Sequence, residues 1–313
     1  MGRLPRLKCS SHDTWYHLYA RLAGRKGEYP LADPLPRRQL IELIHHYASI
    51  YFCEVAAFCV MGNHYHLVLR FDAERDVDRK ELRARAYTMY RGKLMRAIVD
   101  AWGKGEWERY RRRLFDVSEF MRNVQGMYAR WYNRTYERQG RLWGDRFKSV
   151  LLGDERAVLD CVLYVELNPV RAGLVERPET FDGSSVFLRE AGEDGWLVPI
   201  ERLMHRQGRS SAMVEFRQLL YHRGAVPTRE GQARIPQKVL EQETARGFQA
   251  RGAYRKRVAY WVNGVVVGTE GFIRQQLAAL REGGIYRRRR HPIPQLDGVH
   301  WSLRAGRGKR FPS

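Results

Sequence analysis

The sequence has 313 residues, and its 56 lysines and arginines outnumber 35 acidic residues to give a formal net charge of +21. A chain of this length can bury one large core or two modest ones. Because a folded chain this basic most often meets a polyanion, nucleic acid is the first candidate partner. An anionic membrane surface is the competing candidate, but we find neither a supported lipid-anchor motif nor an amphipathic helix with a continuous apolar face.

Targeting and redox signals are few. No stretch approaches the roughly 18 consecutive apolar residues of a membrane-spanning helix, and the first residues lack the apolar core of a signal peptide. We therefore expect a soluble, cytoplasmic protein that binds no membrane. The cysteines show neither a CxxC pair nor the spacing of zinc ligands, so we expect reduced thiols. They are Cys9, Cys53, Cys59 and Cys161.

The first elements read as strand, helix and hairpin. Residues 14–24 are aromatic-rich and end in a glycine turn, which predicts a strand. Residues 37–51 carry apolar side chains at helical spacing. An apolar run over 51–61 and the segment 64–71 follow as two strands joined by a Gly-Asn turn.

The next stretch favours helices. Residues 76–107 are charged and predict one helix with a variable extension. Its expected buried positions are Leu82, Ala86, Met89, Leu94 and Ile98. Residues 116–138 predict an amphipathic helix that begins at a cap formed by Asp116 or Ser118.

A strand and a helix complete the predicted core. Residues 146–153 predict a strand, and Asp154 can cap a helix over 155–168 that Pro169 stops. The predicted class is therefore α+β.

Beyond Val175 the composition changes, and glycine and proline mark a stretch that is typical of a linker. Short helices are expected within 210–222, 234–248 and 269–280. The positive runs near the C-terminus are typical of solvated segments. We predict two parts, a domain over 1–180 and a basic, partly helical extension over 181–313.

Two histidines stand one residue apart in the strand of residues 64–71. Because strand side chains alternate between faces, His64 and His66 project to one side while Tyr65 points to the other. Two imidazoles on one face make half of a metal site. The alternative is a pair of polar residues on a half-exposed strand.

A phenol and an amide share a face of the late helix. Tyr164 and Asn168 are four residues apart and so lie together on a helix. An amide oxygen suits magnesium or manganese, and a phenol beside a bound ion is a candidate nucleophile. The alternatives are that Tyr164 belongs to the helix core and that Asn168 caps the helix end.

These residues resemble a known family. His64-Tyr65-His66 fits the His-hydrophobe-His motif of HUH endonucleases, and "YVELNPVRAGLV" is similar to the signature of the REP-associated tyrosine transposases, a single-tyrosine branch related to insertion-sequence transposases. The intervening "MYARWYNRTYERQGRLWGDRFKSVLL" is similar to that family's long helix, glycine turn and strand. The resemblance spans roughly 14–185 and ends at "FDGSS", where Gly183 replaces the aromatic residue of a Trp-Ser-Ser element, a difference that touches only a packing contact.

The resemblance implies a fold and a reaction. The fold is an RRM-like or ferredoxin-like, mainly antiparallel sheet with helices packed on it. Tyr164 is then the nucleophile, and His64, His66 and Asn168 hold Mg²⁺ or Mn²⁺. The implied activity is that of a transposase that cleaves and rejoins single-stranded or hairpin DNA through a 5′-phosphotyrosine. The implied protein is bacterial, associated with the nucleoid, and a monomer or a homodimer.

Basic and aromatic residues near these motifs are candidates for DNA contact. The cationic candidates are Arg134, Arg138, Arg141, Arg146 and Lys148. Trp131, Tyr132 and Trp143 are candidates for stacking on bases. The alternatives are a solvated cationic face and an aromatic core.

Competing residues and functions stay open. Tyr128, Tyr132 and Tyr136 recur at helical spacing and compete with Tyr164, which has Asn168 as its companion. His45 and His46 are adjacent on a helix, so a shared ligand role is not expected. Two other functions fit in part: a hairpin-binding protein that has lost catalysis, and a replication-initiation or relaxase nuclease, which fits the histidines and not the tyrosine signature.

Overall fold

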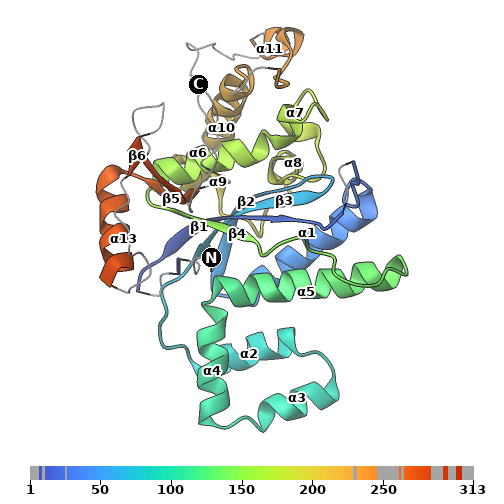
Figure 1. Ribbon diagram of the computed structural model, residues 1–313, viewed down its shortest axis with the longest axis vertical. Coiled ribbons are helices and arrows are strands. Elements are labelled where there is room, and N and C mark those ends of the chain that lie inside the picture. The colour runs from blue at the N-terminus through green and yellow to red at the C-terminus, as the bar shows by residue number, and fades with distance from the viewer. Residues whose placement is uncertain are drawn as a thin grey trace.

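A mixed sheet flanked by helices on both faces forms the centre of the molecule (Figure 1). The computed structural model describes residues 7–8, 11–24, 27–227, 231–244, 261, 264–282, 292–294 and 301–304. Its seven strands run in the order β2-β3-β1-β4-β5-β7-β6, and all neighbouring pairs are antiparallel except β4 with β5. The predicted α+β class is confirmed.

The first half of the chain supplies a complete ferredoxin-like unit. Its elements are β1 (Thr14–Arg21), α1 (Pro34–Ala48), β2 (Cys53–Val60), β3 (His64–Phe71), α5 (Val117–Thr135) and β4 (Lys148–Leu152). This strand-helix-strand-strand-helix-strand sequence, with sheet order β2-β3-β1-β4, is the ferredoxin-like topology. The predicted mainly antiparallel sheet is therefore present.

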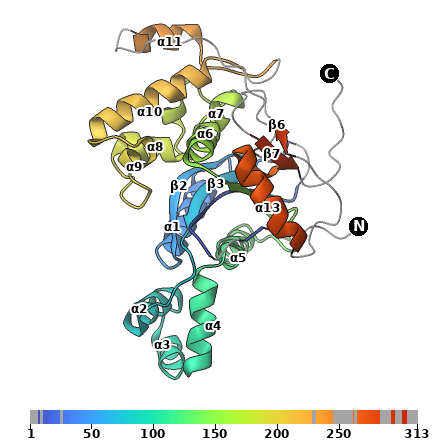
Figure 2. The ribbon, with the colours of Figure 1, turned by 90° about the vertical axis from the view of Figure 1, so that its left-hand side faces the viewer.

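The two faces of the sheet carry different cores. On one face Leu18 and Leu67 pack with α1 and α5, the helices that belong to the ferredoxin-like unit. On the other face Val68 and Val150 pack with helix α6 (Glu155–Glu166). Figures 1 and 2 both show α5 on one side of the sheet and α6 on the other.

Local signals set the helix ends. The Asp116 side chain accepts from Ser118 N at 2.7 Å, so Asp116 is the cap of the two candidates, Asp116 and Ser118. Asp154 accepts from Ala157 N at 2.8 Å, which confirms the predicted cap of α6. Helix α6 ends before Pro169 as expected. The chain then turns at once into α7 (Asn168–Arg171), because a proline in a first helical turn loses no hydrogen bond.

The helix predicted over 76–107 is wrong in one respect, because three helices replace it. They are α2 (Arg79–Met89), α3 (Lys93–Asp100) and α4 (Lys104–Leu114), and they project beyond α5 in both ribbon views. Gly92 breaks the run with a φ of 99°, a left-handed value that favours glycine. The break turns Leu94 and Ile98 outward, to 75% and 46% exposure, where burial was expected.

Further helices follow α7, and the first α-helix among them contacts β2. They are η1 (Pro178–Thr180), α8 (Ser185–Ala191), α9 (Ile200–Met204), α10 (Arg209–Gly224) and α11 (Gln237–Thr244). Val198 N donates to Val55 O at 2.7 Å, and the backbones of Cys59 and Ser184 form an isolated antiparallel β-bridge. This segment therefore covers the outer edge of β2. A covered edge strand is protected from pairing with other chains.

The last described segments extend the sheet from the side of β4. They are β5 (Gly264–Gly268), α13 (Glu270–Glu282), β6 (Ile293–Pro294) and β7 (Trp301–Arg304). The helices expected within 210–222, 234–248 and 269–280 correspond to α10, α11 and α13, whereas the strands were not predicted. The division at residue 180 stays a prediction. Most of the two positive C-terminal runs lies outside the described residues.

The structure bears on two predictions, those on the cysteines and on membrane-spanning helices. Cys53, Cys59 and Cys161 are free cysteines, and Cys9 lies outside the described residues. In the described part of the chain, no helix has both the length and the apolar character that a membrane crossing requires.

The "FDGSS" segment differs from the aromatic packing that the resemblance implies. A Cβ atom at Gly183 would lie 2.6 Å from Arg37 Cδ, 2.6 Å from Phe181 Cε1 and 2.8 Å from the Val60 carbonyl oxygen. No side chain fits there without movement of β2. In place of an aromatic side chain, the backbone at Gly183 lies directly against the backbone of β2 at Val60.

Gly183→Ala tests this packing. We expect a loss of about 1–3 kcal/mol in the free energy of unfolding, because the new methyl group overpacks against backbone. Urea denaturation measures it. The control is Gly195→Ala in the same region, where no atom lies within 4 Å of the added Cβ. Equal stability of the two variants would contradict the close approach.

Candidate active site

The histidine pair lies on the α6 face of the sheet. Their ring centroids are 5.3 Å apart at an interplanar angle of 82°, and His66 is only 1% exposed. In the β1–β3 register, Tyr19 lies opposite His66 and Arg21 opposite His64. The Tyr19 ring contacts both imidazoles, at 5.4 Å from His64 and 5.1 Å from His66.

Burial keeps both imidazoles neutral. Desolvation lowers the pKa of His64 to about 4, with a smaller contribution from the positive charge of Arg21. The pKa of His66 lies well below its usual value, chiefly through desolvation and then through His17 and His64. A neutral imidazole is the form that coordinates a metal ion.

Hydrogen bonds fix the orientation of each ring. His66 Nδ1 lies 2.9 Å from His17 Nε2, and His17 Nδ1 lies 2.8 Å from the carbonyl oxygen of Trp261. His64 Nδ1 lies 2.9 Å from Asn63 Oδ1. His17 is fully buried, and desolvation lowers its pKa to about 4.

The sequence reasoning missed the contribution of β1. His17, Tyr19 and Arg21 alternate along the strand and so face the histidine pair. The alternation was visible in the sequence, but which strand pairs with which is a property of the whole fold. No local pattern indicated that β1 lies between β3 and β4.

Tyr164 lies on α6 directly over the imidazoles. Its ring centroid is 5.6 Å from that of His66 at 89°, and 6.0 Å from that of His17 at 84°. Trp261, from the C-terminal part of the chain, stacks beside it at 6.3 Å and 28°. The structure thus brings the predicted late phenol and the predicted early imidazoles together.

A buried polar cluster anchors α6 at this place. Glu166 is the last residue of α6, two residues after Tyr164. Its carboxylate accepts from the Ser185 hydroxyl and from Val186 N, the latter at 3.1 Å. The same hydroxyl accepts from Phe58 N on β2 at 2.9 Å. Burial raises the pKa of Glu166 to about 7. These hydrogen bonds tie α6 to α8 and to β2.

Asn168 lies beside Tyr164 and caps the helix. Its Nδ2 donates to Tyr164 O at 3.0 Å and to Val165 O at 3.2 Å. The side-chain carbonyl oxygen is therefore the atom that it can offer to a cation. Among the described residues, Asn168 has no hydrogen bond to either imidazole.

The side chains present suit a divalent ion in their chemistry, with one restriction. His64 and His66 offer neutral imidazoles, and Asn168 offers an amide oxygen. Within the described part of the chain, no three His, Cys, Asp or Glu side chains are grouped to hold a metal ion. A cation here would need the amide or the substrate to complete its ligands.

The competing tyrosines lie on the opposite side of the sheet. Tyr128, on α5, is fully buried against Trp143 at a centroid distance of 5.7 Å, and burial raises its pKa. The rings of Tyr132 and Tyr136 contact each other at a centroid distance of 4.5 Å and a tilt of 35°, at the end of the same helix. None of the three faces the histidine pair.

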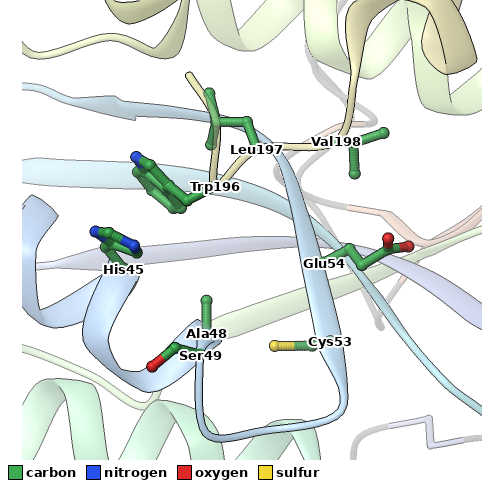
Figure 3. A pocket seen from close by; sticks show the side chains of 8 residues that line it. All are labelled: His45, Ala48, Ser49, Cys53, Glu54, Trp196, Leu197 and Val198. Atoms are coloured by element: carbon green, nitrogen blue, oxygen red, sulfur yellow. The ribbon is translucent and has the colours of Figure 1, made fainter. Parts of the chain in front are cut away.

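His45 and His46 lie on α1, away from the histidine pair of β3. His45 stacks on Trp196 at 4.7 Å and 18°, at a pocket of about 250 Å³ (Figure 3). His46 Nδ1 lies 3.4 Å from an Arg91 guanidinium nitrogen. The pocket is lined by His45, Ala48, Ser49, Cys53, Glu54, Trp196, Leu197 and Val198, and by none of the predicted site residues.

The cationic candidates divide by position. Lys148 lies opposite Tyr19 in the β1–β4 register, with its ammonium 5.6 Å from the Tyr19 ring centroid, so it flanks the imidazoles. The others are Arg134 at the end of α5, and Arg138, Arg141 and Arg146 in the loop before β4. Within the described residues none of these side chains forms an ion pair.

Trp143 does not fit a role in base stacking. Its indole is 9% exposed and donates to Gln125 O at 2.9 Å. Trp143 therefore packs in the core, which was the alternative. Trp131 and Tyr132 are half-buried and keep part of their surface exposed.

Comparisons with known proteins give a likeness among solved structures and none among protein sequences. No protein-family model matches the chain, and no curated protein matches it. Among solved structures, the chain is similar to a REP-associated tyrosine transposase bound to a REP hairpin, with 14% identity and a TM-score of 0.41. The match covers 61% of this chain and 86% of that chain. At this identity it assigns no residue a role.

Proposed function

We propose that the chain is a metal-dependent endonuclease and strand-transferase, a transposase that acts on single-stranded, hairpin-forming DNA through a 5′-phosphotyrosine. The observation that carries the proposal is the Tyr164 ring packed on His66, with His64 on the same face of the sheet. Neutral imidazoles beside a phenol combine metal donors with a nucleophile.

The proposed ligands of Mg²⁺ or Mn²⁺ are His64, His66 and the side-chain oxygen of Asn168. When bound, such an ion would polarise the scissile phosphate and stabilise the charge that develops on its oxygens. The chain itself contributes the fixed orientation of these donors. The hydrogen bonds of His64 to Asn63 and of His66 to His17 hold both rings in place.

The proposed covalent step belongs to Tyr164. Its phenol oxygen attacks phosphorus and its proton passes to solvent, while the bond from phosphorus to the 3′-oxygen breaks and that oxygen takes up a proton. The fragment whose 5′-phosphate lies at the break stays on the tyrosine, and the other fragment of the same strand ends in a 3′-hydroxyl. The link between tyrosine and DNA is itself a phosphodiester, so the energy of the broken bond is kept. Another 3′-hydroxyl can therefore attack this link and rejoin the strand without ATP.

The charge of the chain supports a DNA substrate. A net charge of +21 favours association with phosphates. Lys148 and Arg21 stand beside the imidazoles, on strands that border the site. Single-stranded and hairpin DNA are preferred in this proposal because they expose the backbone to a phenol held on a helix.

A hairpin-binding protein without catalysis is the second candidate. It is favoured by the Asn168 amide, which is engaged in capping α6, and by the lack of a three-residue His, Cys, Asp or Glu metal group in the described part of the chain. An RRM-like sheet can bind nucleic acid without cleaving it. Binding without any covalent product would identify this function.

Tyr164→Phe tests the nucleophile. We expect the covalent protein-DNA adduct to disappear while hairpin affinity is unchanged, because only the attacking oxygen is removed. Denaturing gels with end-labelled hairpin DNA and Mn²⁺ detect the adduct, and a filter-binding titration gives the affinity. Tyr132→Phe is the matched control and should keep the adduct. An undiminished adduct in Tyr164→Phe would overturn the assignment.

His66→Ala tests the metal ligand. We expect cleavage to fall by at least the roughly 10–100-fold that follows loss of even an outer-shell metal partner, and its response to Mn²⁺ to weaken. The measurement is the initial cleavage rate across a Mn²⁺ titration. His45→Ala, in the pocket near α1, should behave as the unmodified chain. Cleavage by the unmodified chain in the presence of a chelator would refute a metal site.

Lys148→Ala tests the phosphate contact beside the site. We expect weaker binding to every hairpin sequence and a salt dependence whose slope is smaller by about 1, because one phosphate contact is lost. Lys104→Ala is the control, since this exposed lysine lies on α4, which Figure 1 shows projecting away from the sheet beyond α5. An unchanged salt slope in Lys148→Ala would remove Lys148 from the interface.

A further inference from the structure

A third histidine is buried behind the proposed ligand His66. His17 is 0% exposed, and its ring is nearly parallel to the His66 ring, with an interplanar angle of 6° and a centroid distance of 5.1 Å. Its two ring nitrogens are both in hydrogen bonds, one to His66 Nδ1 at 2.9 Å and one to Trp261 O at 2.8 Å. In such a row of buried hydrogen bonds each bond needs one donor and one acceptor, so the donor in one bond determines the donor in the next.

The backbone carbonyl of Trp261 sets that order. A carbonyl oxygen only accepts, so His17 Nδ1 carries the proton that it donates to Trp261 O. Within the described residues no carboxylate contacts His17, and an unpaired buried charge is costly, so the imidazole is neutral. A neutral ring with a protonated Nδ1 has a lone pair on Nε2.

The proton position of His66 follows. Because His17 Nε2 can only accept, His66 Nδ1 is the donor of the 2.9 Å hydrogen bond. His66 is then a neutral ring with Nδ1 protonated, and its lone pair is on Nε2. Reversal of the order would require a proton on the carbonyl of Trp261 or a doubly protonated, buried His17.

His64 reaches the same state by another route. Its Nδ1 donates to Asn63 Oδ1 at 2.9 Å, and an amide oxygen only accepts. Both imidazoles of the pair therefore have Nε2 as the free donor atom. Two unrelated partners impose one tautomer on the two rings, as a pair of ligands for one cation would require.

We propose that His17 is a positioning residue that locks His66 into the tautomer with a free Nε2, through a relay that begins at the Trp261 carbonyl in the C-terminal part of the chain. This inference rests on the proposed metal-dependent function. Its added content is that residues outside the 14–185 region complete the site. Trp261 serves twice, because its ring also stacks beside the nucleophile Tyr164.

The tautomer can be measured directly in the full chain without metal or DNA. Long-range ¹H–¹⁵N correlation spectra of protein labelled with ¹⁵N-histidine separate protonated from unprotonated ring nitrogens, and His66→Ala assigns the His66 signals. We expect a protonated Nδ1 and an unprotonated Nε2 at His66, and the same at His17. A protonated Nε2 at His66 in the unmodified chain would overturn the proposal without any variant at position 17.

Variants of His17 test the relay itself. His17→Gln keeps an oxygen acceptor near the place of Nε2, so the His66 tautomer should be retained, whereas His17→Leu removes the acceptor and should release the proton to either nitrogen. Mn²⁺ affinity, measured by the loss of free Mn²⁺ signal in electron paramagnetic resonance, should fall about 10–100-fold in His17→Leu and be rescued in His17→Gln. An unchanged tautomer or unchanged affinity in folded His17→Leu would overturn the proposal.

The outcomes separate this inference from the proposed function. If the unmodified chain has the expected tautomer but binds no Mn²⁺, the metal-dependent function fails. The hydrogen bonds of His17 are then a structural feature only, and the positioning role is refuted. If the unmodified chain binds Mn²⁺ through His66 while His17→Leu matches it in tautomer and affinity, the function stands and the relay fails. The expected tautomer, with affinity lost in Leu and restored in Gln, supports both.

Discussion

The packing of α6 on the face of the sheet that carries His17 and His66 is the interaction on which the rest depends. Val158 and Val162 of α6 contact the core that Val68 and Val150 supply from the sheet, and burial of such apolar surface stabilises the contact by roughly 25 cal/mol per Å². The same contact places Tyr164 over His66. A helix displaced from this face would leave the phenol and the imidazoles as unrelated side chains on separate elements.

That packing buries polar groups, and hydrogen bonds offset the cost. His17 and His66 are almost completely buried, which is unfavourable unless their nitrogens have partners. The relay to Trp261 satisfies them, and the Glu166–Ser185 hydrogen bond does the same at the end of α6. The C-terminal half of the chain thus contacts the site and its helix at two points.

Sequence patterns predicted what depends on near neighbours in the chain. Strand alternation gave the shared face of His64 and His66, and aspartate caps gave the start of α6. Pairing between distant segments was not predictable, so His17 and the strands β5 and β7 were missed. Asn168 shows the limit of a spacing argument, because the step of four places it beside Tyr164 while its amide turns back to the helix carbonyls. Gly92 shows another limit, since one left-handed residue divides a helix-favouring run.

The most direct test of the central claim is to identify the residue that becomes linked to DNA. The full chain is incubated with a labelled library of single-stranded hairpins and Mn²⁺, digested with protease and nuclease, and the nucleotide-bearing peptide is sequenced by mass spectrometry. The account predicts a modified peptide from α6 with the nucleotide on Tyr164. A modified peptide from α5, carrying Tyr128, Tyr132 or Tyr136, would contradict it.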